Sequence, residues 1–389
     1  MKKIILSLGF VVGSLITAKA QWSLVTSGTT SNFDDIYFFD SQNGICGGGN
    51  TYMYKTVDGG STWSQTTNLG FRDYSFVNST NGFAASIVGQ SMAKTTNGAT
   101  SWSMLTPPTS NSLWGVSATS SLTAYFVGTG GVLWKTTNGG TSFTVLNSGT
   151  TNLITDINFT SATTGFIIGQ SGGIRKTTNS GTSWTVVNNP VGPSLTESCF
   201  VNANVGYVVG SGGLILKTAD AGSTWTTQTT NSTSYLQSIH FYDVNTGIAV
   251  GSGGTILYTN DGGTNWYAMT SGVTTMLTDV HMTSATSAVV VGQGGIILKN
   301  NNVFVGIEEH ALSSTEISMY PNPAIDKVTV KSTNDIHSVE VFDITSKLVY
   351  ASGDIKTKEH TIDLSKIKSG EYFVTITGQS GKTTQKLIK

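Results

Sequence analysis

The chain has 389 residues, only 11% of them charged, and its 21 basic and 22 acidic residues give a formal net charge of -1. This composition excludes a disordered polyelectrolyte, a coiled coil and a basic nucleic-acid-binding protein. The 46 glycines and 6 prolines, among many Thr, Ser and Asn residues, indicate a β-rich chain with many tight turns.

Residues 1–20 are predicted to be a secretory signal peptide. Lys2 and Lys3 precede a mostly apolar run at 4–16, which is too short to cross a membrane. A small-x-small Ala-Lys-Ala box ends at Ala20, where we expect cleavage. An N-terminal membrane anchor is the alternative. No other apolar stretch reaches about 18 residues, so the mature protein is expected to have no transmembrane segment.

Self-similarity dominates residues 21–305. The motif Lys55-Thr-Val-Asp58-Gly-Gly60-Ser-Thr-Trp63 recurs with starts that lie 39 residues apart once and then 41 residues apart five times. The seventh copy, which begins at Lys299, lacks its aromatic residue. Trp22 lies 41 residues before Trp63 and supplies the missing piece at the other end of the domain. This period is that of a propeller blade.

Each repeat is predicted to form four short strands. In the copy at 154–187, strands are expected at 156–159, 165–168, 174–177 and 183–187, with a primed hairpin turn at 170–173. Seven such units make an all-β, seven-bladed β-propeller. Residues 21–25 are expected to provide the outer strand of the last blade, which closes the ring and removes an open sheet edge.

The repeated turn, Thr-x-Asp-x-Gly-x-Thr-Trp in its fullest form, resembles the Asp-box of bacterial-neuraminidase-repeat propellers. The wording Val-Gly-Ser-Gly-Gly-x-Ile-Leu-Lys-Thr at 209–218 most resembles the photosystem II assembly-factor-like group of these propellers. The Asp or Asn side chain of each turn is expected to accept N–H bonds of its own turn while the aromatic packs into the blade. These structural residues are Asp58, Asn97, Asn138, Asn179, Asp220 and Asp261, with Trp63, Trp102, Phe143, Trp184, Trp225 and Trp266.

A second domain is predicted at 316–389, after a linker at 306–315. Alternating apolar residues, as in Lys327 to Lys331, with frequent turns indicate a small β-sandwich. Tyr-Pro-Asn-Pro, Val-x-Val-Phe-Asp and Ser-Gly-Glu-Tyr-Phe-Val resemble the type A C-terminal sorting domain of type IX secretion in Bacteroidota. The resemblance implies that 316–389 engages the type IX machinery, that the protein reaches the cell surface or medium, and that the tail is removed. An ordinary adhesive sandwich is the alternative.

Motifs for catalysis are scarce. A sialidase needs an arginine cluster, but the chain has only Arg72 and Arg175. A glycosidase needs two carboxylates, and the propeller offers Glu197 and ten Asp without an inserted loop to wall off a site. No metal or cofactor motif is found, and Cys46 and Cys199 are expected to be unpaired because they fall in distant blades.

One repeat column carries five acids that we expect around one mouth of the channel. They are Asp35, Asp73, Asp156, Glu197 and Asp279. They would either attract a cation or basic peptide or bond to nearby backbone. Arg72 and Trp114, in the preceding column, mark either a partner-binding patch or incidental surface. Cys199, His240 and His281 are a borderline metal set, with ordinary strand packing as the alternative.

The preferred hypothesis is a non-catalytic, exported propeller that binds an extracellular protein or glycan, without a cofactor and without nucleic acid. A polysaccharide-degrading glycoside hydrolase of the Asp-box propeller type is the alternative. A scaffold resembling the assembly-factor group is the third hypothesis.

Overall fold

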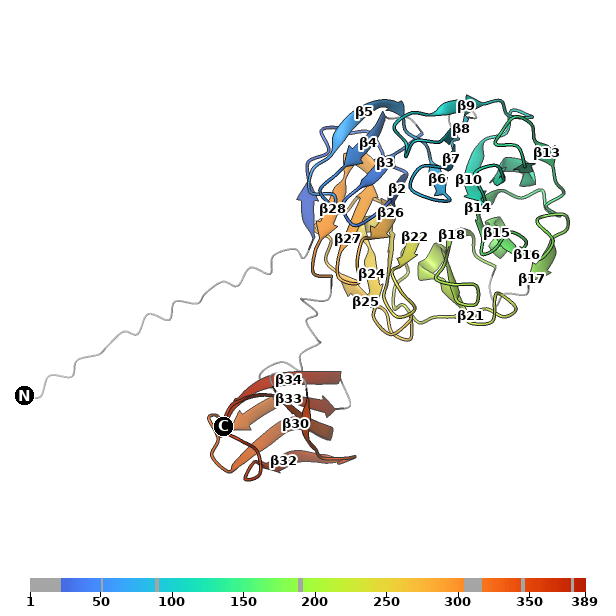
Figure 1. Ribbon diagram of the computed structural model, residues 1–389. Helices are drawn as coiled ribbons and strands as arrows, with labels where there is room; N and C mark the ends of the chain where they lie inside the picture. Colours follow the sequence, from blue (N-terminus) through green and yellow to red (C-terminus); the bar gives the residue numbers. More distant parts are fainter. Residues whose placement is uncertain are drawn as a thin grey trace, which may run out of the picture. The chain divides into compact units, whose positions relative to one another are not determined.

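The computed structural model describes residues 22–49, 52–87, 91–187, 192–303, 317–343, 347–378 and 381–389 (Figure 1). The chain divides into two compact units after Val303. The predicted signal peptide and the predicted linker lie outside the described residues.

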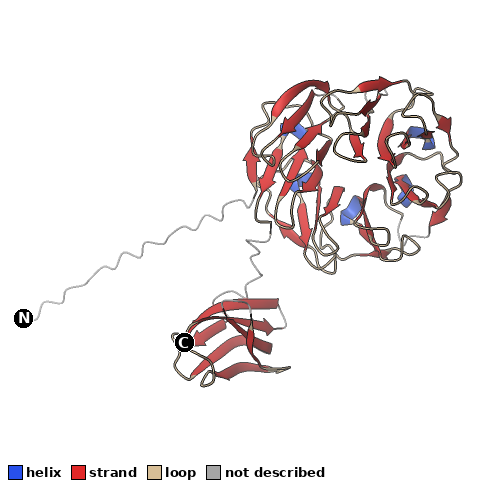
Figure 2. Cartoon of the chain, viewed as in Figure 1, coloured by secondary structure: helices blue, strands red, loops and turns tan. Residues whose placement is uncertain are grey.

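The N-terminal unit is a ring of seven four-stranded antiparallel sheets (Figures 1 and 2), which confirms the predicted propeller. Each sheet runs from an inner strand at the channel to an outer strand at the rim. Blades 1 to 3 contain β2 (Asp35–Phe38), β3 (Gly44–Gly47), β4 (Tyr52–Thr56) and β5 (Ser64–Leu69); β6 (Asp73–Phe76), β7 (Gly82–Ala85), β8 (Met92–Thr95) and β9 (Ser103–Leu105); and β10 (Leu113–Ala118), β11 (Ala124–Gly128), β12 (Leu133–Thr136) and β13 (Thr144–Val145). Blades 4 to 6 contain β14 (Ile154–Phe159), β15 (Gly165–Gly169), β16 (Ile174–Thr177) and β17 (Thr185–Val187); β18 (Leu195–Phe200), β19 (Gly206–Gly210), β20 (Ile215–Thr218) and β21 (Thr226–Thr227); and β22 (Leu236–Phe241), β23 (Gly247–Gly251), β24 (Ile256–Thr259) and β25 (Tyr267–Met269).

Blade 7 closes the ring with strands from both ends of the propeller sequence. Its own copy gives β26 (Leu277–Met282), β27 (Ala288–Gly292) and β28 (Ile297–Asn300), and β1 (Ser23–Val25) pairs antiparallel with β28. The register places Leu24 opposite Leu298. The predicted closure is therefore confirmed for the described part of the N-terminal segment.

In blades 3 to 7 the second and third strands are joined by a tight turn whose two central residues have positive φ. In blade 4, η2 (Gln170–Gly172) has positive φ at both Ser171 (59°) and Gly172 (69°), and Gly173 N–H bonds to the Gln170 carbonyl at 3.4 Å. Two positive φ values define the predicted primed turn. The other copies are η1 (Thr129–Gly131), η3 (Ser211–Gly213), η4 (Ser252–Gly254) and η5 (Gln293–Gly295).

Aromatic and aliphatic side chains fill the spaces between adjacent blades. Tyr207 of blade 5 stacks on Phe241 of blade 6 with ring centroids 3.8 Å apart, and Trp266 packs into the same buried cluster. Stacking adds a directional contribution to the burial of these large apolar surfaces. The blades are thus held together by a core that is shared between neighbours.

The repeated lysines also connect neighbouring blades. The Nζ of Lys176 donates to the Ala221 carbonyl at 2.6 Å, and that of Lys217 donates to the Gly262 carbonyl at 2.6 Å. Both acceptors lie in the Asp-box turn of the next blade. Lys176 also lies 5.7 Å from the centre of the Phe166 ring. The lysine column therefore links one blade to the next.

The C-terminal unit is built around one long strand. It contains β29 (Ile317–Tyr320), β30 (Lys327–Asp343), β31 (Leu348–Ala351), β32 (Thr357–Asp363), β33 (Glu371–Gly378) and β34 (Gly381–Ile388). The first part of β30 pairs with β29 and most of β32, and its last part pairs with β31 and β33. Valines from both parts of β30 enter one buried cluster that consists of tail residues only.

Both cysteines are free thiols, as predicted, and Cys46 is fully buried. Within the described ranges, no helix is long and apolar enough to cross a membrane.

Candidate functional site

The five acids of the repeat column lie close to one another at the mouth where the inner strands begin. The charges of Asp279, Asp73 and Glu197 all act on the carboxyl of Asp35. Asp156 is likewise within electrostatic reach of Asp73 and Glu197. The structure therefore brings these five side chains together.

Four of the five carboxylates accept a backbone N–H from the next blade around the ring. Each acceptor bonds to the residue that follows the same column position in its neighbour. The pairs are Asp35 with Tyr74 N (2.7 Å), Asp73 with Val116 N (2.6 Å), Asp156 with Ser198 N (2.8 Å) and Asp279 with Ile36 N (2.8 Å). The last pair joins blade 7 to blade 1, so the column spans the seam of the ring.

Two blades have no acid in this column, and the backbone N–H of the next blade then bonds to a different acceptor. Gly115 of blade 3 and Ser238 of blade 6 hold the equivalent position, and neither accepts from the next blade in the described structure. In both following blades the resident acid accepts its own neighbour's N–H instead: Ile157 N donates to Asp156 at 2.6 Å and Val280 N donates to Asp279 at 2.8 Å. Both carboxylate oxygens of Asp156 and of Asp279 thus accept backbone hydrogen bonds.

Crowding and burial make these acids hard to ionise. Burial raises the pKa of Asp35 well above its usual value, and the negative charge of Asp279 raises it further. Burial and the charge of Asp279 also raise the pKa of Glu197. Burial raises the pKa of Asp73 in the same direction, with the charge of Asp156 adding to it. The mouth therefore carries less negative charge than five free carboxylates would supply.

The position before the acidic column has threonine in three blades. Each threonine hydroxyl donates to a carbonyl at the start of the next blade's inner strand: Thr155 to Leu195 (2.9 Å), Thr196 to Leu236 (2.9 Å) and Thr278 to Phe33 (2.7 Å). In blades 3 to 7 this residue forms a β-bulge, which turns its side chain away from the regular ladder. The threonine is thus the structural residue of this position.

Arg72 and Trp114 replace that threonine in adjacent blades. The Arg72 guanidinium carbon lies 4.1 Å from the centre of the Trp114 ring, which is a cation–π contact. The Nε of Arg72 is buried and has no hydrogen-bond partner. The positive charge of Arg72 also opposes the burial that raises the pKa of Tyr235, an exposed residue of the opposite blade 6. An arginine, an indole and a phenol therefore share this mouth.

The proposed metal set does not assemble as one site. His240 and His281 stack with ring centroids 4.3 Å apart, and Met282 N donates to the Nδ1 of His240 at 3.3 Å. Burial lowers the pKa of His240 to about 4 and that of His281 well below its usual value. Among the described residues, no group of three or more His, Cys, Asp or Glu side chains could hold a metal ion. Within the described residues, His240 and His281 thus contact each other as stacked rings of blades 6 and 7, and Cys199 does not join them in a group of three.

The Asp-box side chains lie in the turns between the third and fourth strands, away from the channel mouth described above, and they bond within their own turns. Each accepts the N–H four residues later: Asp58 from Thr62, Asn97 from Ser101, Asn138 from Ser142, Asn179 from Ser183, Asp220 from Thr224 and Asp261 from Asn265, at 2.9 to 3.0 Å. These bonds lower the pKa of Asp58 and of Asp220 to about 2. The aromatics Trp63, Trp102, Phe143, Trp184, Trp225 and Trp266 pack against the blades.

Comparison with known families decides the lineage of the propeller. The model of a family described as photosynthesis system II assembly factor YCF48 matches residues 15–151, 142–231 and 177–273, more than half of the chain. The chain belongs to the YCF48 family. A second family, described as the secretion system C-terminal sorting domain, matches residues 318–389. This sorting domain indicates export by type IX secretion to the cell surface or beyond. No curated protein sequence matches the chain.

Solved structures support the fold of this YCF48-family propeller. YCF48 bound to a D1 peptide is 21% identical, with a TM-score of 0.61 over 72% of this chain and 94% of that one. YCF48 from Cyanidioschyzon merolae is 20% identical, with a TM-score of 0.59 over 72% and 98% of the two chains. The GH74 enzyme of Niastella koreensis is 14% identical, with a TM-score of 0.61 over 94% and 74%. At these identities the likeness shows the fold alone.

Proposed function

We propose that this protein is an exported, non-catalytic propeller that binds a protein partner at the mouth where the inner strands begin. The observation that supports this most is the Arg72–Trp114 pair. It stands at the position where three other blades have a threonine that bonds to the next blade. Blades 2 and 3 therefore lack the hydrogen bond from a threonine hydroxyl to the next blade, and they carry instead an arginine and a tryptophan, which are typical anchors of protein interfaces.

The setting of the pair also favours a peptide or protein ligand. Arg72 is only partly buried, and its guanidinium carries several N–H donors that a carbonyl or carboxylate of a partner would accept. The Trp114 ring and the exposed Tyr235 offer flat apolar surface with polar edges. The family relationship agrees with this proposal, because one YCF48 structure holds a D1 peptide. Photosynthetic partners are not implied for an exported protein.

The hydrolase alternative has support from the fold likeness to GH74 enzymes and from carboxyls with raised pKa values. A retaining or inverting glycosidase requires one carboxylate free to act as base or nucleophile. Here four of the five acids accept backbone N–H groups of the neighbouring blade. This bonding favours a structural role for the acids and a binding role for the mouth.

The test compares partner capture by the full-length protein and by Trp114→Thr and Arg72→Thr variants. Threonine restores the repeat residue, so we expect both variants to fold as the wild type does. Surface proteins cross-linked to the wild type and identified by mass spectrometry should be lost from both variants. Tyr242→Ala, which removes an exposed aromatic from the far ends of the strands, is the control and should retain them.

Retention of every partner by both threonine variants would refute the proposed face. Release of reducing sugar from xyloglucan, abolished by Glu197→Gln, would replace the proposal with the hydrolase alternative.

A further inference from the structure

Blade 4 departs from the repeat at two positions on either side of Ile174. Gly173 stands at a position that holds a larger side chain in the other blades with this turn: Val132, Leu214, Thr255 and Ile296. Arg175 pairs with Ile167 in the sheet, and its position holds a buried apolar residue elsewhere: Trp134, Leu216, Leu257 and Leu298. Blade 4 thus lacks one side chain at Gly173 and one buried apolar side chain at Arg175.

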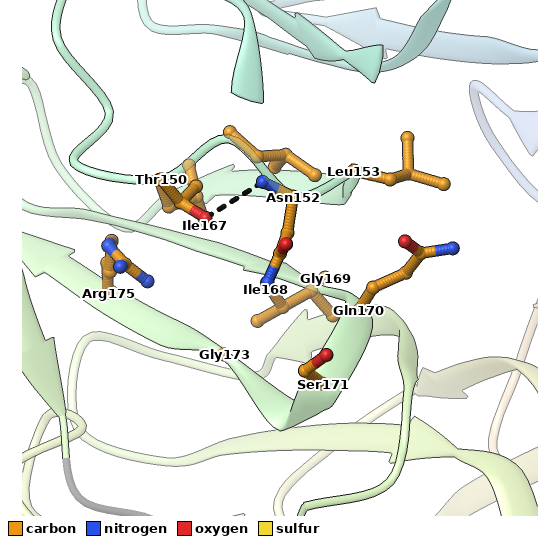
Figure 3. A pocket seen from close by; sticks show the side chains of 11 residues that line it. Thr150, Asn152, Leu153, Ile167, Ile168, Gly169, Gln170, Ser171, Gly173 and Arg175 are labelled. Atoms are coloured by element: carbon orange, nitrogen blue, oxygen red, sulfur yellow. Dashed lines mark hydrogen bonds between the residues drawn. The ribbon is translucent and has the colours of Figure 1, made fainter. Parts of the chain in front are cut away.

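A cavity of about 220 Å³ occupies this part of blade 4. It lies between the connection from blade 3, which supplies Thr150 and Asn152, and the hairpin turn, which supplies Gln170 and Ser171 (Figure 3). Arg175 lines one side of it (Figure 3). A space of this size admits one small organic group or several water molecules.

The Arg175 guanidinium has donors to spare. Its Nη2 donates to the Gly149 carbonyl at 2.9 Å, which uses one of five N–H groups. Among the described residues, no carboxylate pairs with Arg175, and the ion pairs found there lie in the C-terminal unit. The side chains of Asn152, Gln170 and Ser171 make no hydrogen bond within the described structure. The cavity therefore offers one uncompensated cation and several free polar groups.

We propose that this cavity binds a carboxylate group, with Arg175 as its charged partner and Asn152 and Ser171 as additional donors. A guanidinium fork matches the two oxygens of a carboxylate. A single positive charge without a lysine nearby suits a monoanion better than a phosphate. The carboxylate belongs to a peptide, at its C-terminus or on an acidic side chain, or to a uronic acid. The site does not depend on the occupant of the channel mouth.

Blade 5 provides the substitutions that test this site without disturbing the fold. Gly173→Leu copies Leu214 into the cavity. Gly173 has φ of -68°, and an added Cβ would come no closer than 3.5 Å to the atoms around it, so the backbone accepts a side chain at this position. Arg175→Leu copies Leu216 and restores the apolar core of the repeat. Both variants are expected to melt at or above the wild-type temperature, because each replaces a polar or empty position with buried apolar surface.

The experiment titrates the full-length protein with two pairs of probes by calorimetry. The first pair is N-acetyl-tetraalanine with a free carboxylate and the same peptide as an amide. The second pair is glucuronic acid and glucose. We expect at least one acid to bind while its neutral analogue does not, and the responding pair identifies the source of the carboxylate.

Binding should weaken by roughly tenfold or more in Gly173→Leu and in Arg175→Leu, the size of effect expected for a lost charged hydrogen bond. Arg175→Lys, which keeps the charge but not the fork, should fall between. The proposal is overturned if neither acid binds, if the neutral analogues bind equally, or if Gly173→Leu binds as the wild type does. Capture of the partner at the Arg72–Trp114 pair should be unchanged in both leucine variants, so the two proposals fail separately.

Discussion

At the scale of single residues, one column of acids fastens the blades to one another. The Asp35 carboxylate bonds to Tyr74 N of blade 2, and Asp279 bonds to Ile36 N across the seam. The sequence predicted the position of this column but left open whether the acids would bond to backbone or to a ligand. A strict period cannot distinguish a bond within one repeat from a bond to the next, because both recur with the same spacing. Only the ring geometry decides it.

Position-specific departures explain why the site itself was only partly predictable. Arg72 and Trp114 were predicted to mark either a partner-binding patch or incidental surface, and the structure brings the two side chains into contact. The cavity beside Arg175 was missed, although its signal is present in the sequence. Gly173 lacks the side chain that Val132, Leu214, Thr255 and Ile296 supply in the other blades with this turn, and Arg175 stands where those blades have a buried apolar residue. Comparing every column for its exceptions, rather than for its consensus, would have found it.

The buried histidine pair predicts a pH effect on stability. Burial lowers the pKa of His240 to about 4, whereas an unfolded histidine titrates near 6.5. Below about pH 6.5 the unfolded chain therefore binds more protons at this residue than the native one. Stability that is present above that pH is lost as the pH falls toward 4. The acids at the channel mouth act in the opposite direction, since their raised pKa values let the native state hold more protons.

The His240→Asn variant isolates this contribution, because asparagine occupies the same column in blade 4 as Asn158. We expect the variant to be less stable than the wild type at pH 7.5. The difference in free energy of unfolding between the wild type and the variant should decrease by on the order of 2 kcal/mol as the pH falls from 7 to 4.5. Urea unfolding followed by fluorescence at each pH measures this difference. The acids at the channel mouth are the same in both proteins, so their contribution cancels. Parallel pH profiles would contradict the assignment.

At the scale of elements, the repeat located the strands well and their ends less well. In blade 4 a strand was expected at 183–187, but β17 begins at Thr185. Ser183 N is bonded to the Asn179 side chain and so belongs to the Asp-box turn. In the tail, Lys327–Lys331 and Val339–Asp343 were expected as separate strands. The structure joins them in one strand, β30, and its pairing with β32 continues past Lys331 to Ile336, in the residues between the two segments.

The closing strand β1 predicts a large effect of a short deletion. Removing residues 21–25 from the mature protein would take away Trp22, which is only 3% exposed, and leave β28 with a bare edge. Loss of a buried tryptophan costs about 3–5 kcal/mol, and the free edge favours association. We expect a lower urea midpoint and soluble oligomers by light scattering. Trp22→Phe, which copies Phe143 of the same column, should remain monomeric like the wild type. A monomeric deletion variant of normal stability would contradict the role of β1.

At the scale of the whole molecule, the two units have separate cores. The buried cluster of the C-terminal unit consists of its own residues, among them Val328, Val341 and Val374. The sorting domain matched at 318–389 therefore contains a complete core of its own. The length of the repeat and the motif order of the tail made this organisation predictable from the sequence. The partner was not predictable, because recognition depends on a few side chains that break the repeat.

Deleting residues 318–389 should abolish export without unfolding the propeller. In a host with type IX secretion, we expect the truncated protein to accumulate inside the cell, while a fluorescent protein fused to these residues reaches the surface or the medium. Fractionation and immunoblotting measure both outcomes. The melting temperature of the truncated propeller should match that of the full chain. Export of the truncated protein would disprove the assigned role of the tail.

The pairing of β1 with β28 has a consequence for how freely this ring can be re-cut. Because the first and last strands of the propeller are neighbours in one sheet, residues 22 and 303 belong to the same blade. A circular permutant that linked them and opened the chain within any other inter-blade connection would keep every sheet intact. The sheets therefore do not require the propeller sequence to open in blade 7. The hydrogen bonds between blades require only that the cyclic order of the blades be kept.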